Sequence, residues 1–346
     1  MSLHSYSEPR LYIGNIPIDS YSKINYKNKG ANKVSSLRVT ITDPEMDEAA
    51  FMGSELIFYL NYGSSDAVPF FRGFVTQIDP SDKSINITAH DAMTFLAGTE
   101  VPPLVITENS NFDGFTLAQM LHDYIERLVN KKGVKIGLDM LNDTDPPVTL
   151  TGYRNTKGIQ PLKIIQQKIP KNTSTLSDIR NYRLVVRDDG TKSNICFVVE
   201  QDIDSAGVNF SFNDGIEKLQ YKRRPSPNYY TSVVEDSIME YQHNSLPTGI
   251  HSGKLQGKFA YPDAARQEAF FTATAAEDKK EITLTTSKGH YLEIGNIVNL
   301  NVTEYPELIG KHRILSKDIS VSDKKITCKL KLSKEGPTVT DYLQLT

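Results

Sequence analysis

The stretch FRGFVTQIDPSDKSINI, residues 71–87, contains the pattern from which the fold can be inferred. Apolar and polar residues alternate on both sides of Pro80-Ser81-Asp82, as they do in two half-buried strands joined by a turn. The run at 56–60 that precedes it is continuously apolar, which is typical of a strand covered on both faces. The sequence therefore predicts a meander of antiparallel strands in the first hundred residues.

The last third of the chain repeats this order of features. Each region has a glycine, an apolar strand, a loop, a second glycine, a strand, an Asp-Lys turn (82–83 and 323–324) and an alternating strand. We interpret them as diverged copies of one β-module, although generic turn chemistry could also make unrelated meanders look alike. Two sets of residues are predicted to be structural: Gly53, Gly73, Gly295 and Gly310 at tight turns, and Leu37, Val39, Ile41, Ile326 and Leu330 in the cores.

The middle of the chain has a different pattern. Apolar residues recur at helical spacing between 117 and 128, which predicts a helix, and Thr116 and Gln119 form a capping-box pair at its start. A second helix is predicted at 161–169. Asp188-Asp189-Gly190 separates two strand-like runs, so turn geometry explains these carboxylates better than catalysis. A third helix is predicted at 263–276.

These patterns predict a mainly β protein with an α+β middle segment. The expected domains are 1–98, a first β-domain; 99–254, the middle segment, of which 208–236 could return to the first domain; and 255–346, a second β-domain preceded by a helix. In this arrangement two β-barrel or sandwich domains are joined by a mixed insertion.

Charge and hydropathy exclude several classes of function. The 39 Lys and Arg residues against 42 Asp and Glu leave a net charge of −3, whereas a protein that grips nucleic-acid phosphates should be basic. No apolar run approaches the length of a membrane span. We therefore expect neither specific nucleic-acid binding nor membrane insertion by this chain. Cys196 and Cys328 lie in alternating runs and are expected to be buried packing residues in a reducing cytoplasm.

The sequence predicts no catalytic residue, no cofactor and no metal site. The acidic groups at 45–48 and 277–278 are interpreted as solvated turns or helix ends, since a glycosidase needs two carboxylates across one bond. No Gly-x-Ser-x-Gly elbow is present, and Asp202 and Asp204 offer too few oxygen ligands for calcium. Lys222, with the basic residues and tyrosines around it, could be a stacking platform for single-stranded nucleic acid, but a turn before Pro225 is the better interpretation.

Three stretches resemble the baseplate hub proteins of tailed phages, which include the late-control-protein-D-like tail proteins. They are 70–78 with its turn and 89–92, then 210–219 with 228–234, and finally 292–298 through 308–332. In that family they correspond to a strand pair leading into a helix of the first tube-like domain, a Gly-Ile turn before a strand, and a C-terminal tube-like domain. The resemblance covers most of the chain.

The resemblance implies a structural protein, not an enzyme, with two tail-tube-like domains. Three chains would present six similar modules, forming a trimeric pseudo-sixfold ring that joins the hexameric tail tube to a trimeric spike and leaves a channel for DNA. The implied partners are the tail-tube protein, a separate spike protein and other baseplate proteins, in a virion tail baseplate assembled in the host cytoplasm. Two alternatives stay open: a tail-associated peptidoglycan hydrolase, and a carbohydrate-binding adhesin, which the absence of Trp disfavours.

Overall fold

The chain forms two compact units. The structure is a computed structural model. The first unit comprises Met1–Ala206, Thr286–Asn296 and Leu315–Leu330. The second unit comprises Gly207–Thr285, Ile297–Ile314 and Lys331–Thr346. The structure describes residues 9–29, 33–42, 51–60, 69–97, 111–130, 136–139, 149–153, 161–168, 182–199, 205–223, 229–234, 237–242, 252–259, 280–322 and 325–334.

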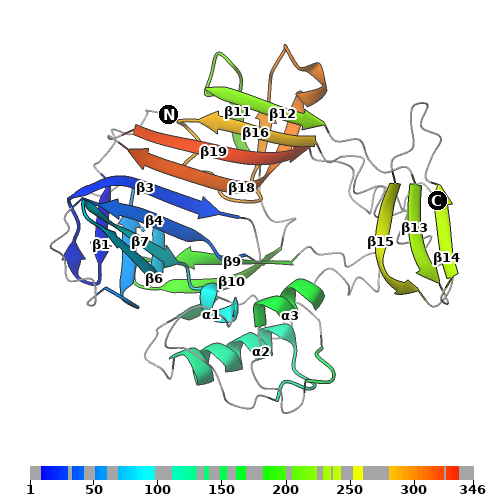
Figure 1. The fold of residues 1–346 in the computed structure, drawn as a ribbon, viewed down its shortest axis with the longest axis horizontal. Coiled ribbons are helices and arrows are strands. Elements are labelled where there is room, and N and C mark those ends of the chain that lie inside the picture. The colour runs from blue at the N-terminus through cyan, green and yellow to red at the C-terminus, as the bar shows by residue number, and fades with distance from the viewer. Residues whose placement is uncertain are drawn as a thin grey trace. The chain divides into compact units, whose positions relative to one another are not determined.

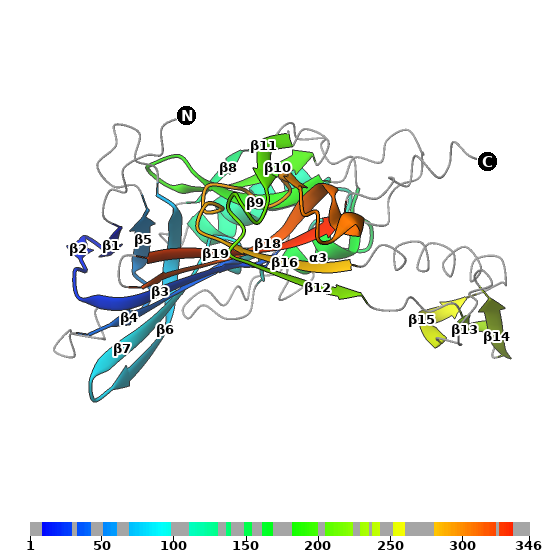
Figure 2. The same ribbon diagram turned by 90° about the horizontal axis from the view of Figure 1, so that it is seen from above.

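The first unit is built on an antiparallel sheet (Figures 1 and 2). Its strands run in the order β18-β3-β4-β7-β6-β5-β1-β2, where β18 is Gly310–Ser322. The β6–β7 hairpin, drawn in cyan, extends beyond its neighbours in Figure 2. The bounds are β1 Arg10–Ile13, β2 Ile16–Pro17, β3 Tyr21–Asn28, β4 Ser36–Ile41, β5 Glu55–Tyr59, β6 Phe71–Ser81 and β7 Ser84–His90. The predicted meander around residues 71–87 is confirmed, with Ser81 paired to Ser84 across its turn.

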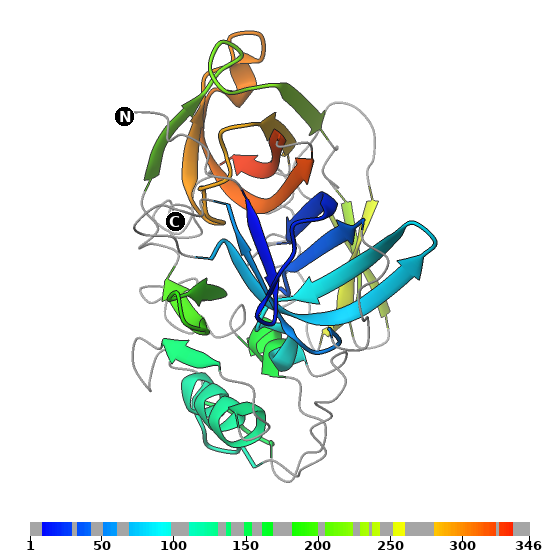
Figure 3. The ribbon, with the colours of Figure 1, turned by 90° about the vertical axis from the view of Figure 1, so that its left-hand side faces the viewer.

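One face of this sheet is the core of the unit. Alternate residues of β4 and β7 are buried, as the period-two pattern of their sequences requires. Leu37, Val39 and Ile41 are fully buried. Figure 3 shows the same strands, in blue to cyan, as a curved sheet rather than a flat one.

Helices and a small sheet make up the rest of the first unit. The bounds are α1 Thr94–Ala97, α2 Leu117–Asp123, a π-helical turn Tyr124–Val129, α3 Pro161–Lys168, β8 Gly137–Asp139, β9 Tyr182–Asp188 and β10 Ser193–Val199. The capping box of Thr116 and Gln119 is present, as predicted, and the antiparallel β9–β10 hairpin confirms the turn at 188–190. A continuous apolar cluster, which includes Phe112, Tyr124 and Phe197, joins the helices to this sheet.

The second unit contains a second set of strands and a separate three-stranded sheet in the order β14-β13-β15. Strands β18 and β19 contribute residues to both units. The bounds are β11 Ser205–Phe210, β12 Lys218–Arg223, β13 Tyr229–Val234, β14 Ser237–Gln242, β15 Ser252–Phe259, β16 Lys280–Thr286, β17 Ile297–Leu300, a 3-10 turn Pro306–Leu308, β18 Gly310–Ser322 and β19 Lys325–Lys334.

The same strand order occurs twice. The first set runs β3-β4-β7-β6-β5-β1, and the second runs β12-β16-β19-β18-β17-β11. Numbered along the chain, each set has the order second, third, sixth, fifth, fourth, first. The last strands also bury matching positions: Ile85, Ile87 and Ala89 in β7, and Ile326, Cys328 and Leu330 in β19. Two unrelated meanders have no reason to share a six-strand order, so the repeat extends further than the sequence pattern suggested.

The second set of strands begins earlier in the chain than residue 255. Strands β11 and β12 belong to this set because β11 pairs with β17 and β12 pairs with β16. The strands β12 and β13, which are described within 208–236, belong to the second compact unit, and residue 255 falls within β15. The helix predicted at 263–276 lies outside the described residues.

Lys317 of β18 is a buried cation of the first unit, 6% exposed. Its Nζ donates to the carbonyl oxygens of His290 at 3.1 Å and Leu292 at 2.6 Å, and it lies 5.1 Å from the centre of the Phe70 ring. Burial lowers the pKa of Lys317 to about 8, although the nearby Cys328 and Glu293 oppose this shift. Lys317 thus holds the segment before β17 against β18.

Asp91 is a second buried titratable group. Its carboxylate accepts hydrogen bonds from the backbone amides of Ser35 at 3.0 Å and Met93 at 3.2 Å. Burial raises the pKa of Asp91 to about 7, while these hydrogen bonds oppose the shift. The side chain joins the start of β4 to the first turn of α1, in the segment 89–92 on which the family resemblance partly rests.

We expect Lys317 to make the protein more stable as the pH rises. Because its pKa is about 8 when folded and 10.5 in the unfolded chain, the unfolded chain binds more protons between these values. The free energy of unfolding of the wild type should rise by about 2 kcal/mol from pH 8 to pH 10 relative to Lys317→Met. Urea unfolding at both pH values measures this. Lys329→Met, on the exposed face of β19, is the control, and a rise that persists in Lys317→Met would contradict the assignment.

Candidate functional site

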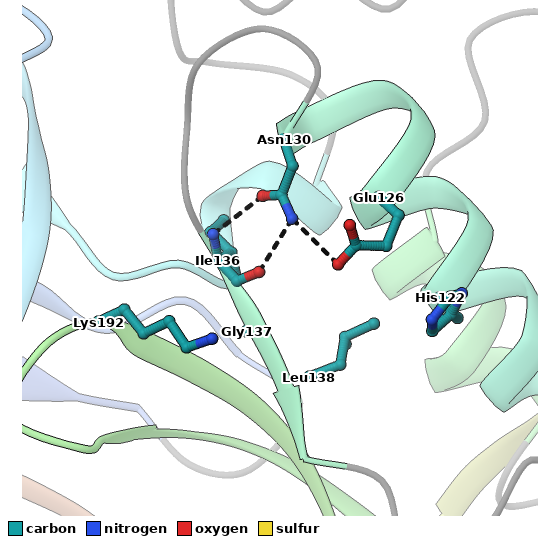
Figure 4. Close-up of a pocket in the computed structure, with 7 residues that line it drawn as sticks. All are labelled: His122, Glu126, Asn130, Ile136, Gly137, Leu138 and Lys192. Atoms are coloured by element: carbon teal, nitrogen blue, oxygen red, sulfur yellow. Dashed lines mark hydrogen bonds between the residues drawn. The ribbon is translucent and has the colours of Figure 1, made fainter.

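The structure has a pocket between α2 with its π-helical turn and the edge of the small sheet (Figure 4). Its volume is about 350 Å³, and it lies entirely within the first unit. The lining residues are His122, Glu126, Asn130, Ile136, Gly137, Leu138 and Lys192. His122, Glu126 and Asn130 are four residues apart and lie on one side of the helix, which faces β8.

Asn130 organises one end of this pocket. Its Oδ1 accepts the backbone N–H of Ile136 at 2.9 Å, while its Nδ2 donates to the Ile136 carbonyl at 3.1 Å and to Glu126 Oε1 at 3.2 Å. The side-chain amide therefore satisfies both backbone groups of the residue that precedes β8. Nothing in the sequence singled out Asn130, since its role depends on a strand that it meets only in the folded chain.

Gly137 has no room for a side chain. A Cβ there would overlap Oδ1 of Asn194, and it would lie 2.9 Å from Cε of Lys192. The stem of Lys192 thus covers the face of β8 on which a side chain of residue 137 would lie, and its amino group reaches toward Gly137 in Figure 4. The pocket combines one carboxylate, one imidazole and one ammonium group with an apolar floor.

This set of residues suits binding better than hydrolysis. A glycosidase needs two carboxylates, and Glu126 is the single one lining the pocket. The acidic groups at 45–48 and 277–278 lie outside the described residues. Within the described part of the chain, no group of three or more His, Cys, Asp or Glu residues is arranged to hold a metal ion.

Arg72 forms a buried ionic cluster that joins β6 to the β9–β10 turn. Its Nε donates to Asp188 at 2.5 Å, its Nη1 to Glu55 at 2.9 Å and its Nη2 to the carbonyl of Gly190 at 3.2 Å. The side chains of Arg72 and Asp188 are 6% and 8% exposed. A buried charge must be paired, so these contacts fix the hairpin on the sheet.

Asp188 and Asp189 both have structural partners. Asp188 accepts the N–H of Gly190 at 2.8 Å, and Asp189 accepts the backbone amides of Thr191 and Lys192 at 2.8 and 2.9 Å. Hydrogen bonds from Thr191 and Asn194, with those backbone amides, lower the pKa of Asp189 well below its usual range. These contacts confirm that turn geometry accounts for the two carboxylates.

The glycines predicted at turns fall into two classes. Gly53, Gly295 and Gly310 have positive φ of 77°, 92° and 125°, a backbone conformation that favours glycine. Gly73 instead lies within β6, paired to Leu56 of β5, where a Cβ would overlap the carbonyl oxygen of His90 and the ring of Phe71. Gly73 is therefore required by a close approach inside the sheet and not by a turn.

Gly73 and Gly310 also do not occupy equivalent places. In the first set Leu56, three residues after Gly53, pairs with Gly73, whereas Val298, three residues after Gly295, pairs with His312. Gly310 pairs two residues further along, with Leu300. Whether two residues occupy equivalent places in the two sets of strands is decided by the register of strand pairing, which cannot be read from a match between two glycines in the sequence.

The remaining core residues and the cysteines are buried. Ile326 is 7% exposed and Leu330 is fully buried, and their place in a tube-like barrel remains a prediction. Cys196 and Cys328 are both buried and not joined in a disulfide. Burial raises the pKa of Cys328 to about 12, which keeps the thiol protonated and unreactive.

The basic stretch at 222–224 begins on strand β12. Lys222 is exposed and lies opposite Glu281 of β16, while Tyr221 lies opposite Ile282. Tyr229 and Tyr230 belong to another strand, β13, and residue 224 lies outside the described part of the chain. Among the helices that the structure describes, none is both long and apolar enough to cross a membrane.

Comparison with solved structures identifies the fold. A tail protein from Neisseria meningitidis MC58 superposes with a TM-score of 0.63 at 12% identity, covering 98% of this chain and 99% of that chain. The 43 kDa tail protein of prophage MuSo2 from Shewanella oneidensis gives 0.61 at 14% identity, with 94% and 97% covered. An E. coli component of the type VI secretion system, which exhibits structural similarity to T4 bacteriophage tail proteins, gives 0.54 at 10% identity, with 93% and 76% covered.

The chain therefore has the fold of phage tail proteins and of related secretion-system components, as the resemblance of its sequence implied. The predicted mainly β architecture is confirmed with it. No protein-family model and no curated protein sequence matches the chain.

We expect Arg72→Met to lower the free energy of unfolding by about 3 kcal/mol, because it leaves the buried carboxylate of Asp188 without its counterion. Urea unfolding at neutral pH measures the loss. The control is Arg38→Met, whose ion pair with Asp79 is 3.7 Å long and about half exposed, and it should change stability by less than about 1 kcal/mol. Equal losses in the two variants would show that the Arg72 cluster does not fix the hairpin.

Proposed function

We propose that the protein is a structural baseplate hub of a phage tail or related injection particle. In this proposal three chains form a pseudo-sixfold ring that joins the hexameric tail tube to a trimeric spike and leaves a channel for DNA. Its partners are the tail-tube protein, a separate spike protein and other baseplate proteins, and it resides in the tail baseplate of a virion assembled in the host cytoplasm. The fold shared with phage tail proteins supports this class of role.

The repeated strand order is the observation that carries the proposal. A chain with two copies of one six-strand order offers two similar modules, so three chains offer six. Such a ring matches a sixfold partner on one side and a threefold partner on the other. Each module would be one tail-tube-like domain, the first within 1–98 and the second formed by the strands in 205–223 and 280–334.

The ends of the strand order favour contact between copies. Among the described strands, β12 and β2 end the main path of the sheet. End strands carry backbone groups that a neighbouring chain can pair with. β2 is only two residues long and contains Pro17, and β12 carries Lys218 and Lys222, features that restrain uncontrolled pairing. A ring would bring such edges together in one defined register.

The face of the first sheet opposite its core suits a channel wall. Thr40 donates to Asn86 at 2.9 Å and Ser320 to Asn25 at 3.1 Å, so uncharged polar groups bridge neighbouring strands. Arg38 is paired with Asp79 on this side, and Lys23 and Lys27 of β3 are exposed on it. In this proposal the polar face lines the channel, and the net charge of −3 of the whole chain favours passage of DNA over tight binding.

The size and symmetry of the purified chain test the proposal. Mass measurement should give about 116 kDa for three chains of 38.8 kDa, and negative-stain images should show a threefold annulus with six lobes. A stable monomer that clears a peptidoglycan suspension would favour the hydrolase. A monomer that binds a glycan array would favour the adhesin, and either result would overturn the hub.

A further inference from the structure

Strand β8 ends the small sheet of the first unit. The strand order is β8-β10-β9 among the described residues, and β8 runs parallel to β10 with Gly137 opposite Asn194 and Leu138 opposite Ile195. One side of β8 therefore bonds to β10, and its other side faces the pocket and the helix (Figure 4). This second side can be assigned residue by residue.

The hydrogen bonds of Asn130 fix the direction of the backbone groups. The N–H and C=O of Ile136 both bond to the Asn130 side chain, which reaches them from the helix (Figure 4) and so from the side of β8 away from β10. Backbone groups alternate along a strand, so those of Gly137 point to β10 and those of Leu138 point to the same side as those of Ile136. Leu138 thus presents a donor and an acceptor toward the pocket, and Asn130 already bonds to Ile136 as an added strand would.

The pocket has the size and chemistry for a short extended segment. Its volume of about 350 Å³ accommodates two or three residues of an extended chain. A residue placed opposite Gly137 would direct its side chain to the face where Lys192 lies, since opposite residues share a face of the sheet. A residue opposite Leu138 would meet the half-buried leucine side chain.

We propose that β8 binds an extended peptide segment of a partner protein as a fourth strand, with an acidic side chain of that segment paired to Lys192. The backbone groups of Leu138 would provide the affinity, and Lys192 and the face of Leu138 would select an acidic residue next to an apolar one. This inference concerns a surface of the single chain, so it does not depend on the oligomeric state proposed above.

The test uses the full-length chain and a blocked tripeptide, N-acetyl-Val-Asp-Val-amide, titrated to about 10 mM with saturation-transfer NMR as the readout. Two peptide controls are matched to it. One replaces Asp by Asn, and the other has methylated backbone nitrogens. The Asp peptide should bind at least threefold more tightly than the Asn peptide, and the methylated peptide should show no saturation transfer.

Two variants separate the backbone contribution from the charge. Leu138→Pro removes the N–H directed at the pocket and leaves the bonds of Gly137 to β10 in place, so it should weaken binding at least tenfold, whereas Leu138→Val should bind as the wild type does. Lys192→Ala should bring the affinity for the Asp peptide down to that for the Asn peptide.

The peptide comparison alone decides the question if Leu138→Pro fails to fold. Absence of saturation transfer from the Asp peptide, equal binding of the methylated peptide, or an unchanged preference for Asp in Lys192→Ala would each overturn the proposal.

Discussion

The rest of the structure depends on the register between paired strands, because in a half-buried sheet one residue of slip exchanges the buried and exposed faces. In β7 and β19 the buried positions alternate without interruption, and each strand pairs with the long strand before it. That constraint fixes which residues form the core. It also leaves the opposite face polar, the face that we assign to the channel in the proposed hub.

Few charged side chains are buried among the described residues, and those that are buried fix one segment of the chain to another. Arg72 and Lys317 are both buried, and each joins segments far apart in the sequence: Arg72 binds the turn at 188–190, and Lys317 binds carbonyl groups at 290 and 292. The free-energy cost of burying the charge differs between these two side chains. Arg72 has two carboxylates as counterions, whereas Lys317 relies on carbonyl oxygens and on a ring, and its pKa falls accordingly. Such a cost is offset where the buried group defines one geometry of the chain.

Sequence reasoning found much of the local structure. It located the hairpins at 71–87 and 182–199, the capping box at Thr116, and the alternating core of β4. It missed the candidate site. Asn130 and Lys192 have ordinary neighbours in the sequence, and they acquire a role only because the helix and the β9–β10 hairpin bring them to the edge of β8.

The sequence by itself determined the buried apolar positions of the alternating strands and the turns of the hairpins at 71–87 and 182–199, since both follow from short-range alternation and from the chemistry of turn-forming residues. Only the tertiary structure decided that the six-strand order occurs twice, that β11 and β12 belong to the second set, and that Gly73 lies inside a sheet. Strand pairing over long separations leaves no local pattern. Backbone hydrogen bonds are the same for every residue, so the partner of a strand is chosen by the packing of whole faces.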